Sequence, residues 1–224
     1  MAEPTRRTGD EWSIETHHSL QKVMEDPGCP DLLKETLDGT LTWQGRNETP
    51  IERAVLSPRV VPVWSAALLA LDAQVTLETE EGGSEQLSYQ ILLDSRPDGD
   101  LARLTVRLQG ERSGHARVSR TVADEPIVTA TAVVTLSPDD DTVQKARVVL
   151  TGVSGDAIHS AQAVSGLVRE RLTAERIREV AAQIPNEVDP PTDFRGSAEY
   201  RRAMSAVVTR RALDQCLNQE ESNG

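Results

Sequence analysis

The sequence contains few aromatic residues and few cysteines. One Phe, two Tyr and three Trp occur among 224 residues, so Val, Leu, Ile and Ala must fill the core, and aromatic stacking on nucleic-acid bases is not expected. Cys29 and Cys216 lie near opposite ends, and neither has a second cysteine at two-residue spacing or a flanking His array. This pattern predicts two free thiols in a reducing compartment and no zinc or iron–sulfur site.

Positive charge and long apolar runs are also scarce. The formal net charge is -12, and an acidic surface repels phosphate backbones and anionic headgroups. The sequence has no run of about 18 apolar residues, as a spanning helix requires, and the first residues lack the apolar region of a signal peptide. We therefore expect no nucleic-acid partner, no membrane partner and a cytoplasmic location.

No group of residues has the spacing of a catalytic or metal site. His17 and His18 are adjacent, but neighbours on a helix diverge by about 100°, and no third ligand of metal-site spacing accompanies them. Ser154 and Ser165 precede glycines without forming the Gly-x-Ser-x-Gly elbow of hydrolases. The sequence therefore predicts no catalytic residue and no metal site, as in a non-catalytic subunit.

Local patterns predict strands followed by helices. Residues 64–73 are apolar almost all round and predict a buried helix, whereas residues 40–58, with Gly45 and two prolines among polar residues, predict an irregular loop. Alternation or β-branched content predicts strands at 75–77, 87–93, 104–108, 127–136 and 143–153. Helical spacing predicts helices at 161–171, at 173–184 and from Ser197, a good N-cap. This order indicates an α+β fold.

The last predicted helix carries two kinds of surface. Apolar residues recur at helical spacing and predict a core-facing stripe; they are Tyr200, Ala203, Met204, Val207 and Val208. Basic residues predict a second face, read either as solvated or as a docking surface for a partner; they are Arg201, Arg202, Arg210 and Arg211.

The C-terminal third carries a long and specific signature. Residues 193–202 read DFRGSAEYRR and residues 207–213 read VVTRRAL. Together they resemble the closing signature of the flavoprotein (medium) subunits of the molybdenum hydroxylases, the family of carbon monoxide dehydrogenase and xanthine dehydrogenase. Residues 146–153 are similar to a strand of that family. In these subunits the signature lies in the last helix of the C-terminal domain, where its role is packing and subunit contact.

The resemblance extends upstream to residue 12. Residues 66–73 are similar to the family's helix after its second FAD motif, and Arg46 with Asn47 resembles the start of that motif. The implied organisation is a degenerate middle FAD-binding-like α/β subdomain at 12–110, and a C-terminal domain at 111–217, with a helical bundle on one face of an antiparallel sheet. Disordered tails are expected at 1–11 and 218–224.

The departures from the family bear on the cofactor. Family members hold the FAD diphosphate with two glycine-rich turns, because backbone without a Cβ brings several N–H donors against phosphate. The N-terminal subdomain with the first turn is expected to be absent, and the second should fall within residues 48–56, which read ETPIERAVL and lack glycine. Glu48 and Glu52 would also repel a diphosphate. The sequence therefore predicts no bound FAD, although FAD is expected if the family function is retained.

Remnants of a cofactor cleft are the candidate site residues. If the cleft persists, the resemblance places Arg46, Asn47, Arg117 and Arg120 in it, and the three arginines would favour an anionic ligand. Arg120 is the residue of segment 115–120 that is kept outright from the family's pattern.

Three hypotheses remain open. In the first, the chain is a docking or assembly subunit for a molybdenum-containing large subunit or an iron–sulfur small subunit. In the second, it is a working flavoprotein subunit in which FAD carries the electron-transfer chemistry. In the third, it is a free-standing binding or oligomerisation module, such as a homodimer, with a repurposed cleft.

Overall fold

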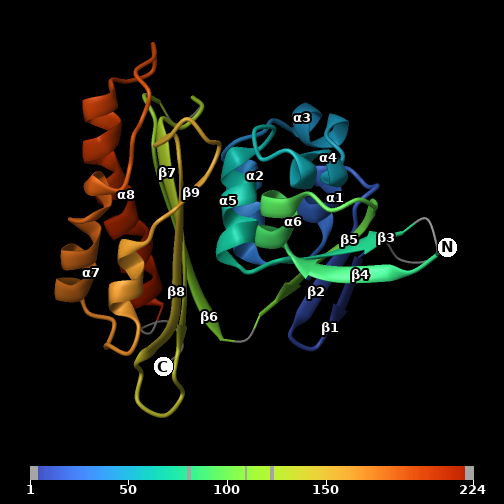
Figure 1. Cartoon of the computed structure of the whole chain (residues 1–224), viewed down its shortest axis with the longest axis horizontal. Coiled ribbons are helices and arrows are strands. Elements are labelled where there is room, and N and C mark those ends of the chain that lie inside the picture. Colours follow the sequence, from blue (N-terminus) through green and yellow to red (C-terminus); the bar gives the residue numbers. More distant parts are fainter. Residues whose placement is uncertain (1–4, 80–81, 109, 122–123, 220–224) are drawn as a thin grey trace. The chain divides into compact units, whose positions relative to one another are not determined.

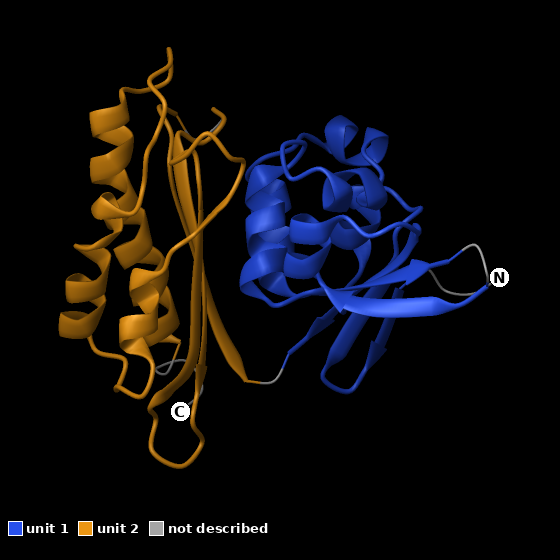
Figure 2. Cartoon of the chain, viewed as in Figure 1, with its two compact units in different colours: residues 1–109 blue, residues 110–224 orange. Residues whose placement is uncertain are grey.

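The computed structural model describes residues 5–79, 82–108, 110–121 and 124–219. The chain forms two compact units, Met1–Gln109 (unit 1) and Gly110–Gly224 (unit 2), coloured separately in Figure 2. Each unit combines one antiparallel sheet with helices, which confirms the predicted α+β class.

Unit 1 is a five-stranded sheet with its helices gathered on one side (Figure 1). The strand order is β1-β2-β5-β3-β4, with every neighbouring pair antiparallel. The strands are β1 (Thr5–Thr8), β2 (Glu11–Glu15), β3 (Gln74–Glu78), β4 (Ser84–Ser88) and β5 (Asp100–Arg107). The helices are α1 (Leu20–Glu25), α2 (Asp31–Asp38), α3 (Trp43–Glu48), α4 (Ile51–Leu56), α5 (Pro62–Ala70) and α6 (Tyr89–Ser95).

The core of unit 1 forms around α5, the helix that the apolar run at 64–73 predicts. Its residues from Val63 to Ala70 are all buried, because a short helix that is apolar all round has no face suited to water. Tyr89, the first residue of α6, is also fully buried and donates its hydroxyl hydrogen bond to the carbonyl of Val55 at 3.1 Å. The hydrogen bond ties α6 to the end of α4.

Unit 2 is a four-stranded antiparallel sheet, β6-β7-β8-β9, covered on one face by helices (Figure 1). The strands are β6 (Glu111–Val118), β7 (Val128–Leu136), β8 (Val143–Thr151) and β9 (His159–Ser160). The helical elements are η1 (Ala163–Leu167), α7 (Ala174–Ala181), η2 (Ile184–Asn186) and α8 (Ala198–Asn218). The core consists mainly of Val, Leu, Ala and Ile from the sheet and from these helices.

Helix α8 lies very close to strand β6. A Cβ added at Gly114 would stand 2.1 Å from the carbonyl oxygen of Ala212, so only glycine permits this approach. Two glutamines also hydrogen-bond to the β6 backbone: Gln215 of α8 accepts from the His115 amide at 2.7 Å, and Gln219, the C-cap residue of α8, accepts from the Ser113 amide at 3.0 Å. Side chains of α8 thus satisfy the outer edge of β6, where an unpaired strand edge is prone to aggregation.

Several predictions about unit 1 were wrong. Residues 40–58, expected to be a loop, contain α3 and α4, because Thr42 caps α3 and Pro50 precedes α4, and six-residue helices are too short for a visible period. Residues 5–11, expected within a tail, form β1 and begin β2, since a polar edge strand is held by backbone pairing alone. Residues 89–93 of the expected strand at 87–93 belong to α6, which Ser88 caps.

The predictions for unit 2 fared better. The strands expected at 127–136 and 143–153 are confirmed and pair as the hairpin of β7 and β8. The helix from Ser197 is also confirmed, and the Ser197 hydroxyl accepts the Tyr200 amide. The helix expected at 161–171 was wrong, because only the short η1 forms there. The expected tail at 218–224 begins inside α8, which ends at Asn218, and residues 220–224 lie outside the described part of the chain.

Candidate functional site

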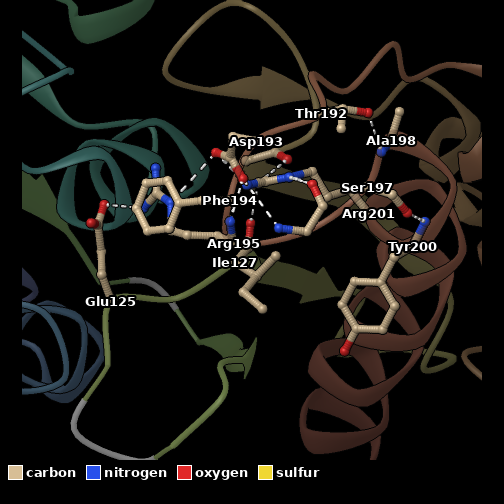
Figure 3. A network of polar contacts seen from close by, with 12 residues as sticks. Glu125, Ile127, Thr192, Asp193, Phe194, Arg195, Ser197, Ala198, Tyr200 and Arg201 are labelled. Carbon is tan, nitrogen blue, oxygen red and sulfur yellow. Dashed lines mark hydrogen bonds and ion pairs between the residues drawn. The ribbon is translucent and has the colours of Figure 1, made fainter.

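An ion pair between Asp193 and Arg201 organises the segment before α8 (Figure 3). The Arg201 guanidinium donates to both carboxylate oxygens of Asp193, at 2.7 and 2.8 Å. It also donates to the backbone carbonyls of Ile127 at 2.7 Å and Gly152 at 3.0 Å. The Arg201 side chain is only 3% exposed, so one buried charge joins the pre-helix segment to the residue before β7 and the residue after β8. We call Asp193, Arg201 and these two carbonyls the Arg201 clamp.

Local sequence builds the clamp. Asp193 also accepts the backbone N–H groups of Arg195 at 2.9 Å and Gly196 at 3.1 Å, as a short acidic side chain does in a tight turn. Thr192 accepts the Ala198 amide and Ser197 accepts the Tyr200 amide. Two N–H donors of the first turn of α8 are therefore satisfied by side chains that precede it.

The electrostatics of the clamp favour the ionised carboxylate. The hydrogen bonds from Arg201 lower the pKa of Asp193 to about 2, and the amides of Arg195 and Gly196 act in the same direction. Gly152 is required beside it: its φ is +73°, and an added Cβ would stand 2.1 Å from the Ile127 carbonyl oxygen. The Asp193 carboxylate therefore remains ionised throughout the neutral range, and the clamp tolerates no side chain at Gly152.

Beside the clamp, the turn presents aromatic side chains to solvent. Phe194 is 83% exposed and Tyr200 is 41% exposed. Arg195 stacks its guanidinium 5.8 Å from the Phe194 ring centroid and forms a 2.7 Å ion pair with Glu125. We call Phe194, Arg195 and Tyr200 the 194–200 surface. Large exposed aromatic groups on a rigid turn are typical of binding surfaces.

The basic face predicted for α8 is only partly correct. Arg201 is buried in the clamp, Arg202 is partly exposed 3.6 Å from Asp189, and Arg210 and Arg211 are exposed. The predicted apolar stripe was also wrong in phase, because among its members only Val208 is buried. The buried stripe is instead Arg201, Ser205, Val208, Thr209, Ala212, Leu213 and Cys216. A helix that buries an arginine and hydroxyls against a sheet is not found by hydrophobic spacing.

In unit 1, Arg46 and Asn47 lie on α3. Arg46 donates to the Leu41 carbonyl at 2.7 Å and to the Gln21 side chain at 3.0 Å, and it stands 3.5 Å from the Asp38 carboxylate. Asn47 donates to a carbonyl one turn earlier in its own helix, that of Trp43, at 2.9 Å. Arg46 therefore contributes to the contacts between the helices of unit 1.

In unit 2, Arg117 lies on β6 and Arg120 just after it. Arg120 donates to the carbonyls of Phe194 and Arg195, so it holds the turn that carries the 194–200 surface. Arg117 stands near His115, which is buried and hydrogen-bonds Thr131 at 3.2 Å. Burial, and to a smaller extent the charge of Arg117, lower the pKa of His115 to about 4. The four predicted residues are thus divided between the two units, with two in each.

Residues 48–56, where the resemblance places a glycine-rich turn, are mostly the helix α4. The Ile51 amide donates to the His18 carbonyl at 2.8 Å, and the Glu52 amide donates to the Thr16 carbonyl at 2.9 Å. The Ala54 amide donates to the Pro50 carbonyl at 3.2 Å. Because these donors already have protein acceptors, a phosphate at this segment would have to displace internal hydrogen bonds. The residues present do not fit the cradle of a diphosphate.

Sequence reasoning missed the Arg201 clamp, although its signal was present. Residues 193–202 were recognised as a signature, but Arg201 was grouped with the exposed arginines of α8. The available sequence pattern is an Asp followed by a Gly-Ser N-cap and then by an arginine one turn into the helix.

No helix among the described residues is both long and apolar enough to cross a bilayer.

Sequence comparisons show which known proteins this chain is similar to. Residues 116–216 match the family described as the CO dehydrogenase flavoprotein C-terminal domain. The uncharacterized protein YgfM of Escherichia coli K12 is 25% identical over 189 residues, which cover 84% of this chain and 66% of YgfM. The carbon monoxide dehydrogenase medium chain of Hydrogenophaga pseudoflava is 26% identical over 156 residues, covering 66% of this chain and 54% of the relative.

A solved structure shows the same fold. The structure of the Hydrogenophaga pseudoflava carbon monoxide dehydrogenase that lacks the Mo-pyranopterin moiety matches with a TM-score of 0.81 at 21% identity. The match covers 96% of this chain and 78% of that one. By sequence, the chain spans somewhat less than two thirds of the length of YgfM and of the carbon monoxide dehydrogenase medium chain.

Proposed function

We propose that this chain, which is similar to a carbon monoxide dehydrogenase medium chain, acts in docking or assembly within a molybdenum hydroxylase complex without itself holding FAD. The observation that carries the proposal is the hydrogen bonding of residues 48–56. The amides of Ile51 and Glu52 donate to the carbonyls of His18 and Thr16, and the segment contains no glycine.

Charge at the same segment supports the proposal. Glu48 ends α3 and Glu52 lies in the first turn of α4, and both are exposed. A carboxylate beside a diphosphate repels it, at a cost of about 1 kcal/mol or more per close pair. A medium subunit that used this segment for a cofactor would need bare N–H groups here in place of carboxylates.

The docking part of the proposal rests on the 194–200 surface. Phe194 is almost fully exposed, while the backbone that carries it is fixed by Asp193, Arg120 and the buried Arg201. A rigid turn that presents an aromatic ring loses little conformational entropy on association. The partner that we propose is the molybdenum-containing large subunit or the iron–sulfur small subunit implied by the family resemblance.

A flavin titration tests the first part. The purified full chain would be titrated with FAD while flavin fluorescence is followed, with a carbon monoxide dehydrogenase medium chain as the positive control. We expect no saturable quenching at micromolar FAD, because the N–H donors of residues 48–56 are occupied. Saturable binding of one FAD per chain, or flavin bands in protein from its native host, would overturn the proposal. Those results would favour the rival hypothesis, an electron-transferring flavoprotein subunit.

Recovery of a complex tests the second part. The chain would be coexpressed with the hydroxylase large and small subunits of its own host and isolated by affinity. We expect Phe194→Ala to weaken association by about tenfold or more, as loss of a central aromatic contact does. The matched control is Ile91→Ala, which removes a 52% exposed apolar side chain from unit 1. If no complex forms, or if both variants behave like the unaltered chain, docking through the 194–200 surface is wrong.

A further inference from the structure

Three potential metal ligands converge where β2 ends. The Glu15 carboxylate oxygen Oε2 lies 3.7 Å from His17 Nε2 and 3.9 Å from His18 Nε2. One ligand atom from each residue lies within 4.8 Å of the other two. The side chains of His17, Glu15 and His18 are 67%, 31% and 27% exposed, so an ion in solution can reach all three.

The chain path explains why the two histidines face the same way. Both precede Ser19, the N-cap of α1, and therefore lie in a turn and not on the helix. The divergence of about 100° between helical neighbours does not apply to them, and their ring centroids are 4.0 Å apart. The sequence prediction of no third ligand overlooked Glu15, the last residue of the strand that leads into this turn.

The backbone under the three side chains is fixed. The Thr16 amide donates to the Ala102 carbonyl at 3.0 Å, the Thr16 carbonyl accepts from Glu52, and the His18 carbonyl accepts from Ile51. One of these bonds crosses to β5, and the other two cross to α4. Ligands held on a fixed backbone lose little entropy when a metal binds. Helix α4, which occupies the segment resembling a glycine-rich turn, thus secures the His17–His18 turn.

We propose that Glu15, His17 and His18 bind a divalent transition-metal ion of the Zn²⁺ class. Ligand atoms about 2.1 Å from a tetrahedral metal stand about 3.4 Å apart, so separations of 3.7 and 3.9 Å require only small side-chain movements. Two imidazoles and one carboxylate suit Zn²⁺, Co²⁺ or Ni²⁺ better than Ca²⁺ or Mg²⁺. Three protein ligands leave a coordination position for water or another ligand. This inference is independent of whether the chain binds FAD.

Neighbouring groups leave the ligand atoms available. Arg103 approaches the other carboxylate oxygen of Glu15, Oε1, at 3.9 Å, which leaves Oε2 directed at the histidines. The two cysteines do not compete for the ion, because both are buried. Burial raises the pKa of Cys29 and raises the pKa of Cys216 to about 12, and a thiol must lose its proton to bind a metal.

A cobalt titration tests the site. The full chain, free of any histidine tag and stripped with a chelator, would be titrated with Co²⁺ while its visible absorption is recorded, and Zn²⁺ would then be added as a competitor. We expect one Co²⁺ per chain without the intense near-ultraviolet bands of thiolate ligation, followed by displacement by Zn²⁺. His17→Ala, His18→Ala and Glu15→Gln should each weaken binding by about tenfold or more, as loss of one of three ligands does.

The control is His159→Gln, which alters a histidine of unit 2 and should leave affinity unchanged. Tryptophan fluorescence, which arises from Trp12 on β2 and from the two other tryptophans of unit 1, reports whether each variant remains folded. Metal binding should also raise the unfolding midpoint seen by this fluorescence in the unaltered chain and not in the ligand variants. Absence of saturable binding, or equal loss of affinity in His159→Gln, would overturn the proposal.

Discussion

The two units differ in how their family-like segments, residues 193–201 and residues 48–56, are hydrogen-bonded. In unit 2, residues 193–201 form a clamp in which Asp193, Arg201 and two strand carbonyls satisfy one another. In unit 1, residues 48–56 comprise the last residue of α3 and all of α4, and the amides of Ile51 and Glu52 donate to carbonyls of the β2–α1 connection. A signature that serves packing can have all its polar groups hydrogen-bonded within the chain. A turn that binds a cofactor phosphate needs backbone N–H donors that have no acceptor in the protein. In unit 1 the amides of Ile51 and Glu52 have acceptors within the unit, which is the difference on which the proposed lack of FAD rests.

The tryptophans allow this comparison to be measured unit by unit. Trp12, Trp43 and Trp64 all lie in unit 1, and unit 2 contains none. Tryptophan fluorescence therefore reports on unit 1, while far-ultraviolet circular dichroism reports on both. A change confined to unit 2 should appear in the second signal and leave the first unaltered if the units unfold separately.

The largest expected effect is the loss of the clamp. Arg201→Ala should lower the free energy of unfolding of unit 2 by about 3 to 5 kcal/mol, because it leaves Asp193 and the Ile127 and Gly152 carbonyls without their buried partner. Urea unfolding followed by circular dichroism measures it.

Arg202→Ala is the matched control on the next residue of α8. Arg202 is 38% exposed and stands 3.6 Å from the fully exposed Asp189, so its removal should cost less than about 1 kcal/mol. Equal effects of the two substitutions, or an Arg201→Ala effect seen first in tryptophan fluorescence, would contradict the role assigned to the clamp.

The next effect concerns pH and His115. Its pKa is about 4 in the folded unit, against 6.5 as the ordinary value. Above pH 6.5 the folded and unfolded states are both neutral; between about 6.5 and 4 only the unfolded state gains the proton. Unit 2 should therefore lose about 3 kcal/mol as pH falls through this window.

His115→Gln tests this dependence, since it removes the titrating ring and keeps a polar side chain near Thr131. We expect a flatter plot of unfolding free energy against pH between 6.5 and 4.5. Asp193 has a pKa of about 2 in the folded unit. Protonation of its carboxylate therefore lowers the free energy of unfolding of unit 2 only below this pH window, as pH falls toward about 2. An unchanged slope in the variant would show that His115 is not the group responsible.

The smallest effect probes unit 1. Tyr89→Phe removes the hydrogen bond that Tyr89 donates to the Val55 carbonyl at the end of α4 and should cost about 1 kcal/mol. Tryptophan fluorescence during urea unfolding measures it. The control is Tyr200→Phe, which alters a 41% exposed ring in unit 2. It should change the free energy of unfolding measured by that fluorescence by less than about 0.5 kcal/mol. A silent Tyr89→Phe would mean that α4 is held without this bond.

Sequence patterns predicted some of this structure and missed definable parts. They identified the buried helix α5, the β7–β8 hairpin and the Ser197 cap of α8, because each rests on neighbouring residues. They missed α3, α4 and β1, which are too short or too polar to show a period. The roles of Arg46, Asn47, Arg117 and Arg120 in any ligand cleft stay predictions, and flavin titration bears on them.

The sequence by itself determined the α+β class and the family resemblance, since apolar spacing, caps and the 193–202 signature are local properties. Only the tertiary structure decided which polar groups meet. Arg201 reaches carbonyls 49 and 74 residues away along the chain, and the amides of Ile51 and Glu52 find the carbonyls of His18 and Thr16. Such partners are set by how strands and helices pack, because hydrogen bonds depend on distance and direction in space and not on separation along the chain.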